Sequence, residues 1–110
     1  MKVIVFHKEK EYIKKFIKLP EKIYSKKERT NNPKTETELL EGNHVLSHYF
    51  ETTGFVVLDE KGLPLSRCMV TVYPNDETAY VGFFESVNNM EASNLLFAEV
   101  EKFCRTRGFT

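Results

Sequence analysis

The stretch AYVGFFESVNNMEASNLL, Ala79 to Leu96, joins a dense apolar run directly to a segment with helical spacing. Its first part has apolar residues at both parities, which is typical of a central strand that is covered on two sides. In its second part, Asn88 and Glu91 have the separation of a capping box. We therefore expect a central strand at Thr78–Glu85 that leads, without an intervening glycine, into a helix capped by Asn88.

The helix that follows is the clearest one of the chain. Gly108 is expected to end it, and Arg105 and Arg107 suit its C-terminal dipole. A buried stripe is predicted on one face, and its members are Ala92, Leu95, Leu96, Val100, Phe103 and Cys104.

Two further strands are predicted upstream, at Phe55–Leu58 and Leu65–Tyr73. The turn Asp59–Gly62 connects them, with Gly62 supplying a positive φ. A second turn, Pro74–Asp76, leads into the strand at Thr78. Consecutive strands joined by tight turns indicate an antiparallel meander.

The N-terminal half begins with an expected strand at Lys2–His7. A helix follows from Glu9, and Pro20 is expected to interrupt it and to begin another short helix. The apolar stripe of these helices is predicted to contain Tyr12, Ile13, Phe16 and Ile17, followed by Ile23 and Tyr24.

A polar surface loop is expected at Ser25–Pro33, before another helix. Thr35 and Glu38 have capping-box spacing for this helix, and Gly42–Asn43 is expected to end or kink it. A helical turn is predicted at His44–Phe50, with Leu46, Tyr49 and Phe50 facing inward.

Length and composition indicate one soluble domain over residues 1–110, of which 41% are hydrophobic and 29% charged. No apolar run reaches the roughly 18 residues of a membrane-spanning helix. The apolar run Val3–Phe6 is shorter than the about 7–15 residues of a secretory signal. We therefore expect a cytoplasmic α+β protein, with a meander of about four strands, N-terminal helices and one C-terminal helix.

Charge is unevenly distributed along the chain. The 16 basic and 16 acidic residues cancel overall, but residues 1–35 hold 11 of the basic and 4 of the acidic ones. A basic segment favours either an anionic partner, such as a nucleic acid, or a solvated helix face. No nucleic-acid-binding motif accompanies the clusters Lys14–Lys15 and Lys26–Lys27, so we expect the solvated face.

The cysteines and histidines do not form a metal-ligand pattern. Cys68 and Cys104 lack CxxC spacing and lie in apolar patterns, so we expect buried, reduced thiols. His7, His44 and His48 are candidate proton carriers. The last two share a helix face, but a pair without a third ligand is a weak signal. We therefore expect no metal site.

Several motifs resemble a known family. They are FIKLPEKIY (Phe16–Tyr24), Asn32–Pro33, YVGFFES (Tyr80–Ser86) and the helix that ends in RTRGF (Arg105–Phe109). With the element order, they resemble the first part of the Gcn5-related N-acetyltransferase (acyl-CoA N-acyltransferase) superfamily, and in particular an uncharacterised bacterial acetyltransferase-like subgroup. The resemblance covers nearly the whole chain. FxxLPxxxY and GFFE are recognisable together, although each alone is a weak signal.

The resemblance implies a larger sheet whose fourth strand, here Tyr80–Glu85, splays from a fifth and holds the pantetheine of an acyl-CoA in the gap. It implies Glu85 as the general base that deprotonates an amine substrate. The start of the following helix would meet the CoA pyrophosphate, since free N–H groups and a positive dipole end favour anions. The implied cofactor-binding residues are Gly82, Phe83, Phe84, Asn88, Asn89 and Met90.

This sequence departs from the family pattern in two ways. The Gln/Arg-x-x-Gly-x-Gly/Ala stretch of the family is Ser86–Ala92 here and has no glycine, while Glu85 and Glu91 add negative charge. The later strands are missing, which indicates the N-terminal portion of an acetyltransferase-like fold. We therefore expect this chain alone to bind acetyl-CoA or another acyl-CoA weakly or not at all, and to be inactive.

Other interpretations of the same stretch stay open. We also read it as an ordinary strand-to-helix junction with a capping box, and Glu85 as a solvated carboxylate. Gly82 marks either a bulge or close backbone approach, or packing beneath an aromatic neighbour. In a different functional class, the chain is a non-catalytic interaction module that forms a homodimer through the sheet edge beyond the third meander strand.

Overall fold

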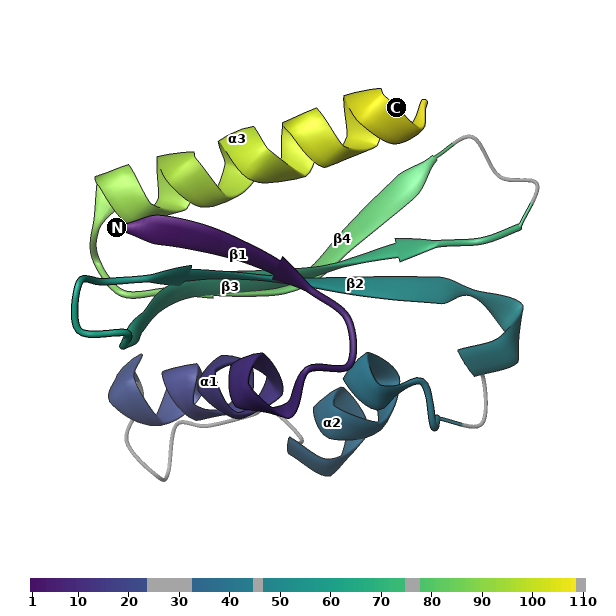
Figure 1. Cartoon of the computed structure of the whole chain (residues 1–110), viewed down its shortest axis with the longest axis horizontal. Helices are drawn as coiled ribbons and strands as arrows, with labels where there is room; N and C mark the ends of the chain where they lie inside the picture. The colour runs from purple at the N-terminus through teal and green to yellow at the C-terminus, as the bar shows by residue number, and fades with distance from the viewer. Residues whose placement is uncertain (24–32, 45–46, 75–77, 109–110) are drawn as a thin grey trace.

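The computed structural model of the chain describes residues 1–23, 33–44, 47–74 and 78–108. It confirms an α+β fold with a four-stranded antiparallel sheet of order β1-β2-β3-β4 (Figure 1). The elements in chain order are β1 (Lys2–Phe6), α1 (Lys10–Ile23), α2 (Pro33–Glu41), the 3-10 helix η1 (Ser47–Tyr49), β2 (Glu51–Leu58), β3 (Pro64–Val72), β4 (Ala79–Ser86) and α3 (Met90–Arg107).

The sheet separates two layers of helices. α1 and α2 lie on one face and α3 lies on the other (Figure 1). Side chains of β2 contribute alternately to the two cores, because successive side chains of a strand point to opposite faces. Phe55 and Val57 pack with the stripe of α3, whereas Val56 and Leu58 pack with Ile13 and other residues of α1 and α2.

The turn between β2 and β3 confirms the predicted hairpin. Gly62 has a φ of 82°, and its N–H donates to the carbonyl of Asp59 at 3.0 Å. The Asp59 carboxylate also accepts from the N–H groups of Lys61 and Leu63 at 2.8 and 2.9 Å. This side chain explains why an aspartate opens the turn.

Gly54, near the middle of β2, makes room for an aromatic ring from β1. Phe6 lies directly opposite in the register, and a Cβ on Gly54 would come within 2.4 Å of its ring. Glycine is therefore required at this position by packing, and the ring of Phe6 covers the backbone that glycine leaves open.

The prediction of a central strand at Thr78–Glu85 is wrong. β4 pairs only with β3 and lies at the edge of the described sheet. The strands with neighbours on both sides are β2 and β3, and their interior residues are almost all buried. The large apolar residues at both parities of β4 instead retain 43–49% of their accessible surface, and Ala79 is half-buried.

The expected interruption at Pro20 is also wrong, because α1 continues through it to Ile23. A proline in a helix leaves the carbonyl four residues earlier without its N–H donor. That carbonyl belongs to Phe16, and the guanidinium of Arg67 donates to it at 2.8 Å. A side chain from β3 thus replaces the missing helical bond.

The helix α2 begins at Pro33, two residues before the cap predicted at Thr35. Proline suits the first position of a helix, where its N–H is not needed. The end at Gly42–Asn43 is confirmed. The N–H of Gly42 donates to the carbonyl of Leu39 and that of Asn43 to Glu38, as in a Schellman motif.

The predicted helical turn at His44–Phe50 is only partly correct. η1 covers three residues of it, and Phe50 is half-buried. Tyr49 is 57% exposed, so its expected inward orientation is wrong. Leu46 lies outside the described residues, as do Tyr24, Phe109, most of the predicted loop Ser25–Pro33 and most of the turn Pro74–Asp76.

Within the described ranges, the search for helices long and apolar enough to cross a membrane finds none.

Candidate functional site

A β-bulge interrupts the pairing of β4 with β3. Arg67 pairs with Glu85 and Met69 pairs with Gly82, so both Phe83 and Phe84 lie opposite the single residue between them on β3. Phe83 has a φ of 56°, in the left-handed region that costs an L-residue roughly 1–2 kcal/mol. A bulge leaves its extra residue outside the ladder and increases the local twist.

Gly82 directly precedes this bulge. This agrees with the interpretation that a glycine inside this strand marks a bulge. A Cβ at this position would meet nothing within 4 Å, and φ here is not positive. Apart from its chain neighbours Val81 and Phe83, no aromatic ring of the described residues therefore packs over Gly82. The open space beside Gly82 is instead accessible from the edge of the sheet.

The aromatic residues of β4 are exposed rather than enclosed. Phe83 and Phe84 both retain more than two fifths of their accessible surface. The ring of Phe84 packs against Phe97 of α3, with 5.0 Å between the ring centroids. Phe97 is itself largely exposed, so this pair forms an apolar surface between β4 and α3.

Asn89, and not Asn88, caps α3. The side chain of Asn89 accepts a hydrogen bond from the Ala92 N–H at 3.0 Å, and its carbonyl accepts from Ser93. The predicted Asn88–Glu91 capping box is thus wrong by one residue, and Asn88 is exposed. Of the first N–H groups of α3, those of Met90 and Glu91 remain for an external acceptor.

The surroundings of this helix start are acidic. Glu91 lines a cavity of about 510 Å³ together with Met1, Lys61, Leu63, Asp59 and Glu60 of the β2–β3 turn. Three acidic residues therefore line this space, together with Lys61 and the N-terminal residue. The sequence predicted that Glu91 would add negative charge at the helix start. It did not predict Asp59 and Glu60, because only the fold brings this turn close to Glu91.

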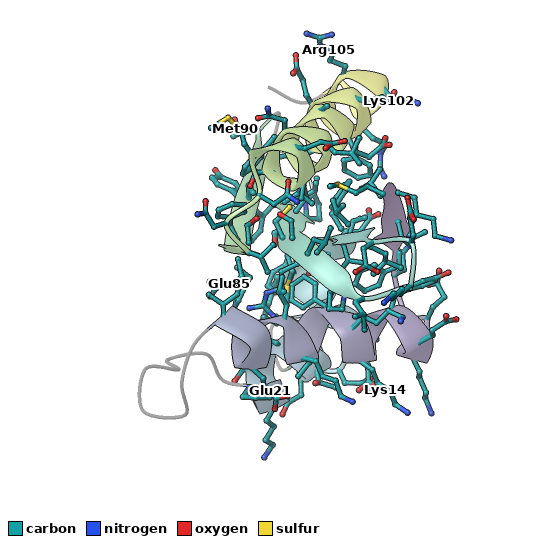
Figure 2. The ribbon with its side chains drawn as sticks, turned by 90° about the vertical axis from the view of Figure 1, so that its left-hand side faces the viewer. Lys14, Glu21, Glu85, Met90, Lys102 and Arg105 are labelled. Carbon is teal, nitrogen blue, oxygen red and sulfur yellow. The ribbon has the colours of Figure 1, made fainter. Side chains whose placement is uncertain are left out.

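Glu85 lies on the other side of the sheet from the start of α3. It pairs with Arg67 in the register, on the face that α1 and α2 cover. Figure 2 shows Glu85 beside the end of α1 and Met90 at the start of α3, on the other side of the sheet. The predicted general base and the predicted anion-binding residues are thus close in sequence but divided between two faces of one edge.

The main buried polar cluster was missed by sequence reasoning. Arg67 and Glu36 are each 1% exposed, and the Arg67 Nη1 and Nη2 atoms donate to the two Glu36 carboxylate oxygens at 2.8 and 3.1 Å. The guanidinium also lies 4.3 Å from the ring centroid of Phe16. The signal in the sequence was an arginine in the middle of an apolar strand.

The cluster of Arg67, Glu36 and Phe16 connects three elements, and it is too deeply buried for a substrate to reach. Its members come from α1, α2 and β3, and the pair has almost no solvent access. The Arg67 Nε atom is buried without a hydrogen-bond partner. We therefore assign it a role in holding the two N-terminal helices on the sheet.

The basic residues of α1 lie mostly on a solvated face, as the sequence predicted, but Lys15 of the cluster Lys14–Lys15 is half-buried and its Nζ atom donates to the Gly62 carbonyl at 2.6 Å. Lys10, Lys14 and Lys18 are exposed along one side of the helix, and Lys14 points away from the body of the protein in Figure 2. They border a cavity of about 390 Å³ whose floor includes Ile13 and Ile17. This arrangement is that of a solvated helix face.

The cysteines are both unpaired. Burial raises the pKa of the Cys68 thiol to about 12, and burial also raises the pKa of Cys104. Cys68 is fully buried as predicted, whereas Cys104 is half-buried. Raised pKa values favour the neutral thiol, so neither is an activated nucleophile.

The histidines do not converge on one site. His7 is exposed at the end of β1, with its Nε2 atom 3.3 Å from the Thr53 hydroxyl. His44 follows α2, and the side chain of His48 lies outside the described residues. Among the residues that the structure covers, no group of three His, Cys, Asp or Glu side chains is placed to hold a metal ion.

Comparison with known proteins finds no match to a protein-family model, to a curated protein or to a solved structure. The relationship to the acyl-CoA N-acyltransferase superfamily is therefore a proposal that rests on the sequence motifs and the local geometry.

Proposed function

We propose that this chain forms the acyl-CoA-binding N-terminal half of an N-acyltransferase-like fold, which transfers an acyl group to an amine in the complete fold. The observation that carries the proposal is the bulged, open-edged β4 that runs directly into the start of α3. A bulge at an edge frees backbone groups for a ligand that lies along the strand. The helix start then offers N–H groups to a phosphate.

Several of the predicted residues have a role in this proposal. Pantetheine would lie along the edge at Gly82 and Phe83, where space is open. The pyrophosphate would approach the N–H groups of Met90 and Glu91, and the amine would enter from the face of Glu85. Glu85 would take a proton from the ammonium, and the amine would attack the thioester carbonyl and release CoA as the thiol.

The same geometry limits the affinity of the isolated chain. The carboxylates of Glu91, Asp59 and Glu60 around one cavity oppose an anionic ligand. A cofactor site that buries most of its ligand also needs two walls, and the described β4 provides one. We therefore expect weak binding of acetyl-CoA, with an affinity of about millimolar, and no measurable turnover by this chain.

Nuclear magnetic resonance titration of the ¹⁵N-labelled chain with acetyl-CoA tests the proposal. At millimolar ligand we expect shifts confined to the N–H groups of Gly82, Phe83, Asn89 and Met90. Glu91→Gln should strengthen binding, while Glu11→Gln, the same charge change on the opposite face of the sheet, should not. The absence of localised shifts at millimolar acetyl-CoA would refute acyl-CoA binding. Micromolar affinity for acetyl-CoA, measured by calorimetry, would refute the expected weak binding and would indicate a working site.

A further inference from the structure

The two edges of the sheet are protected to different degrees. β1 has 5 residues and begins with the exposed Lys2. β4 has 8 residues and one charged side chain, Glu85 near its end. Short length and lysine are the usual means by which an edge strand avoids pairing with another chain. β4 therefore lacks, over its first residues, the protection that β1 has.

We infer that β4 pairs with β4 of a second copy of this chain, antiparallel and across a two-fold axis at Val81. The pairing would use the part of the regular strand that is symmetric about this axis, Tyr80 to Gly82, which directly precedes the bulge. It would join the two sheets into one continuous sheet, as in other cases of strand addition.

The register follows from the faces of the strand. A two-fold axis normal to the sheet keeps both copies of α3 on the same side, so residues directly opposite each other share a face. An axis at Val81 places each Tyr80 opposite Gly82 of the second copy. Gly82 has open space where a side chain would stand, and the half-exposed ring of Tyr80 would cover it.

Two arguments favour a second copy of this chain as the partner of β4: the positions of the charges, and the closed symmetry of the resulting dimer. In the antiparallel arrangement the two Glu85 carboxylates lie at opposite ends of the joined strands, whereas a parallel arrangement would set them side by side. Pairing of β4 with itself uses the same patch on both copies and closes at two chains. Pairing of β4 with β1 would leave a free edge on each side and would extend indefinitely.

This inference concerns self-association and does not depend on acyl-CoA. It uses part of the edge at which we place pantetheine, so one occupant would displace the other there. The two proposals can be tested separately. Self-association is measured as the molecular mass without ligand, and acetyl-CoA binding is measured at a protein concentration low enough to keep the chain monomeric.

Sedimentation equilibrium over a range of concentrations is the first test. We expect a mass that rises from 12.9 kDa to twice that value and no further. Val81→Lys should leave the monomer at all concentrations, because two lysines would meet on the axis. The matched control is Val5→Lys on β1, whose side chain is 40% exposed compared with 46% for Val81; it should still dimerise.

Crosslinking gives a second test that does not require the lysine variant to fold. In a Cys104→Ala background, Val81→Cys should form a disulfide-linked dimer on mild oxidation, since opposite Cα atoms of antiparallel strands are about 4.5–5.5 Å apart. Val5→Cys should not. A wild-type monomer at every concentration, a Val81→Lys dimer, masses beyond two chains, or crosslinking through Val5 and not Val81 would each overturn the inference.

Discussion

At the scale of single residues, Arg67 and Glu36 form an ion pair in which both partners are 1% exposed. A bidentate ion pair with both partners buried contributes little net stability, because desolvation offsets the attraction. Removing one partner is different, since the other is left as an uncompensated buried charge. Arg67 also donates a hydrogen bond to the Phe16 carbonyl, which has no helical donor because Pro20 lacks an N–H group.

Glu36→Ala is expected to lower the free energy of unfolding by about 3–5 kcal/mol. The substitution leaves the Arg67 guanidinium buried, with the Phe16 carbonyl as its one remaining oxygen partner among those described. Chemical denaturation measures the change. Glu38→Ala on the same helix should stay within about 0.5 kcal/mol. Similar midpoints for the two variants would contradict the assigned role of the pair.

The buried thiol of Cys68 is expected to make stability fall at alkaline pH. Burial raises its pKa to about 12 in the folded state from an ordinary value of 9.0, so the unfolded chain loses this proton first. The stability contribution is complete below pH 9 and is lost as the pH rises toward 12. Unfolding free energies measured across this window should fall more steeply for the wild type than for Cys68→Ala. Parallel slopes would contradict the raised pKa.

The residue patterns explain why Cys68 could be predicted and Arg67 could not. Cys68 belongs to an alternating apolar set, and such a set defines a buried face. Arg67 lies on the other face of the same strand, where a charged residue ordinarily indicates solvent. Its burial depends on Glu36 and Phe16, which are 31 and 51 residues away, and no local pattern contains that pairing.

At the scale of elements, α3 depends on Asn89 for its first turn. Asn89→Ala is expected to cost about 1 kcal/mol, because the Ala92 N–H loses its acceptor. Asn88→Ala is the matched control, one residue earlier and exposed, and should be close to neutral. Thermal or chemical unfolding of both variants decides between them. A larger loss for Asn88→Ala would restore the cap that the sequence predicted.

The bulge in β4 is expected to reverse the usual preference between alanine and glycine in a strand. Glycine normally weakens a strand, but Phe83 has a φ of 56°, which glycine adopts without strain. Phe83→Gly should therefore be more stable than Phe83→Ala by up to about 1 kcal/mol. Denaturation of the two variants measures the difference. A more stable alanine variant would place Phe83 in an ordinary extended conformation.

The existence of β4 and α3 was predictable, whereas their details were not. Apolar runs and helical spacing identify elements. They do not distinguish a strand that is covered on both faces from an edge strand that exposes both, because the sequence letters are the same. The choice between Asn88 and Asn89 depends similarly on which of two adjacent asparagines takes the extended backbone that a cap requires.

At the scale of the whole molecule, the order of elements was sufficient to predict the meander and the α+β class. Short connections make consecutive strands neighbours, and the stripes of the helices indicate that each covers a sheet. The division of the candidate site between two faces of β4 was not predictable. It follows from the bulge, which depends on the pairing of β4 with β3.

Because neighbouring residues of β2 belong to opposite cores, the two halves of the molecule should unfold together. Val57 packs toward α3 and Leu58 toward α1, so neither helical layer can separate without exposing a strand that the other needs. Leu96→Ala, on α3, is expected to lower the unfolding free energy by about 2–5 kcal/mol. Asn94→Ala, exposed on the same helix, should change it by less than about 0.5 kcal/mol.

The measurement is urea denaturation followed by methyl resonances from each core, those of Val57 for the α3 side and those of Leu58 for the α1 side. In the wild type and in Leu96→Ala, both signals should disappear at one common midpoint, because a two-state domain has no populated half-folded form. The midpoint should move to lower urea in Leu96→Ala for both signals equally. If the Val57 signal alone moved, the helical layers would be separate cooperative units, and the shared strand β2 would not couple them.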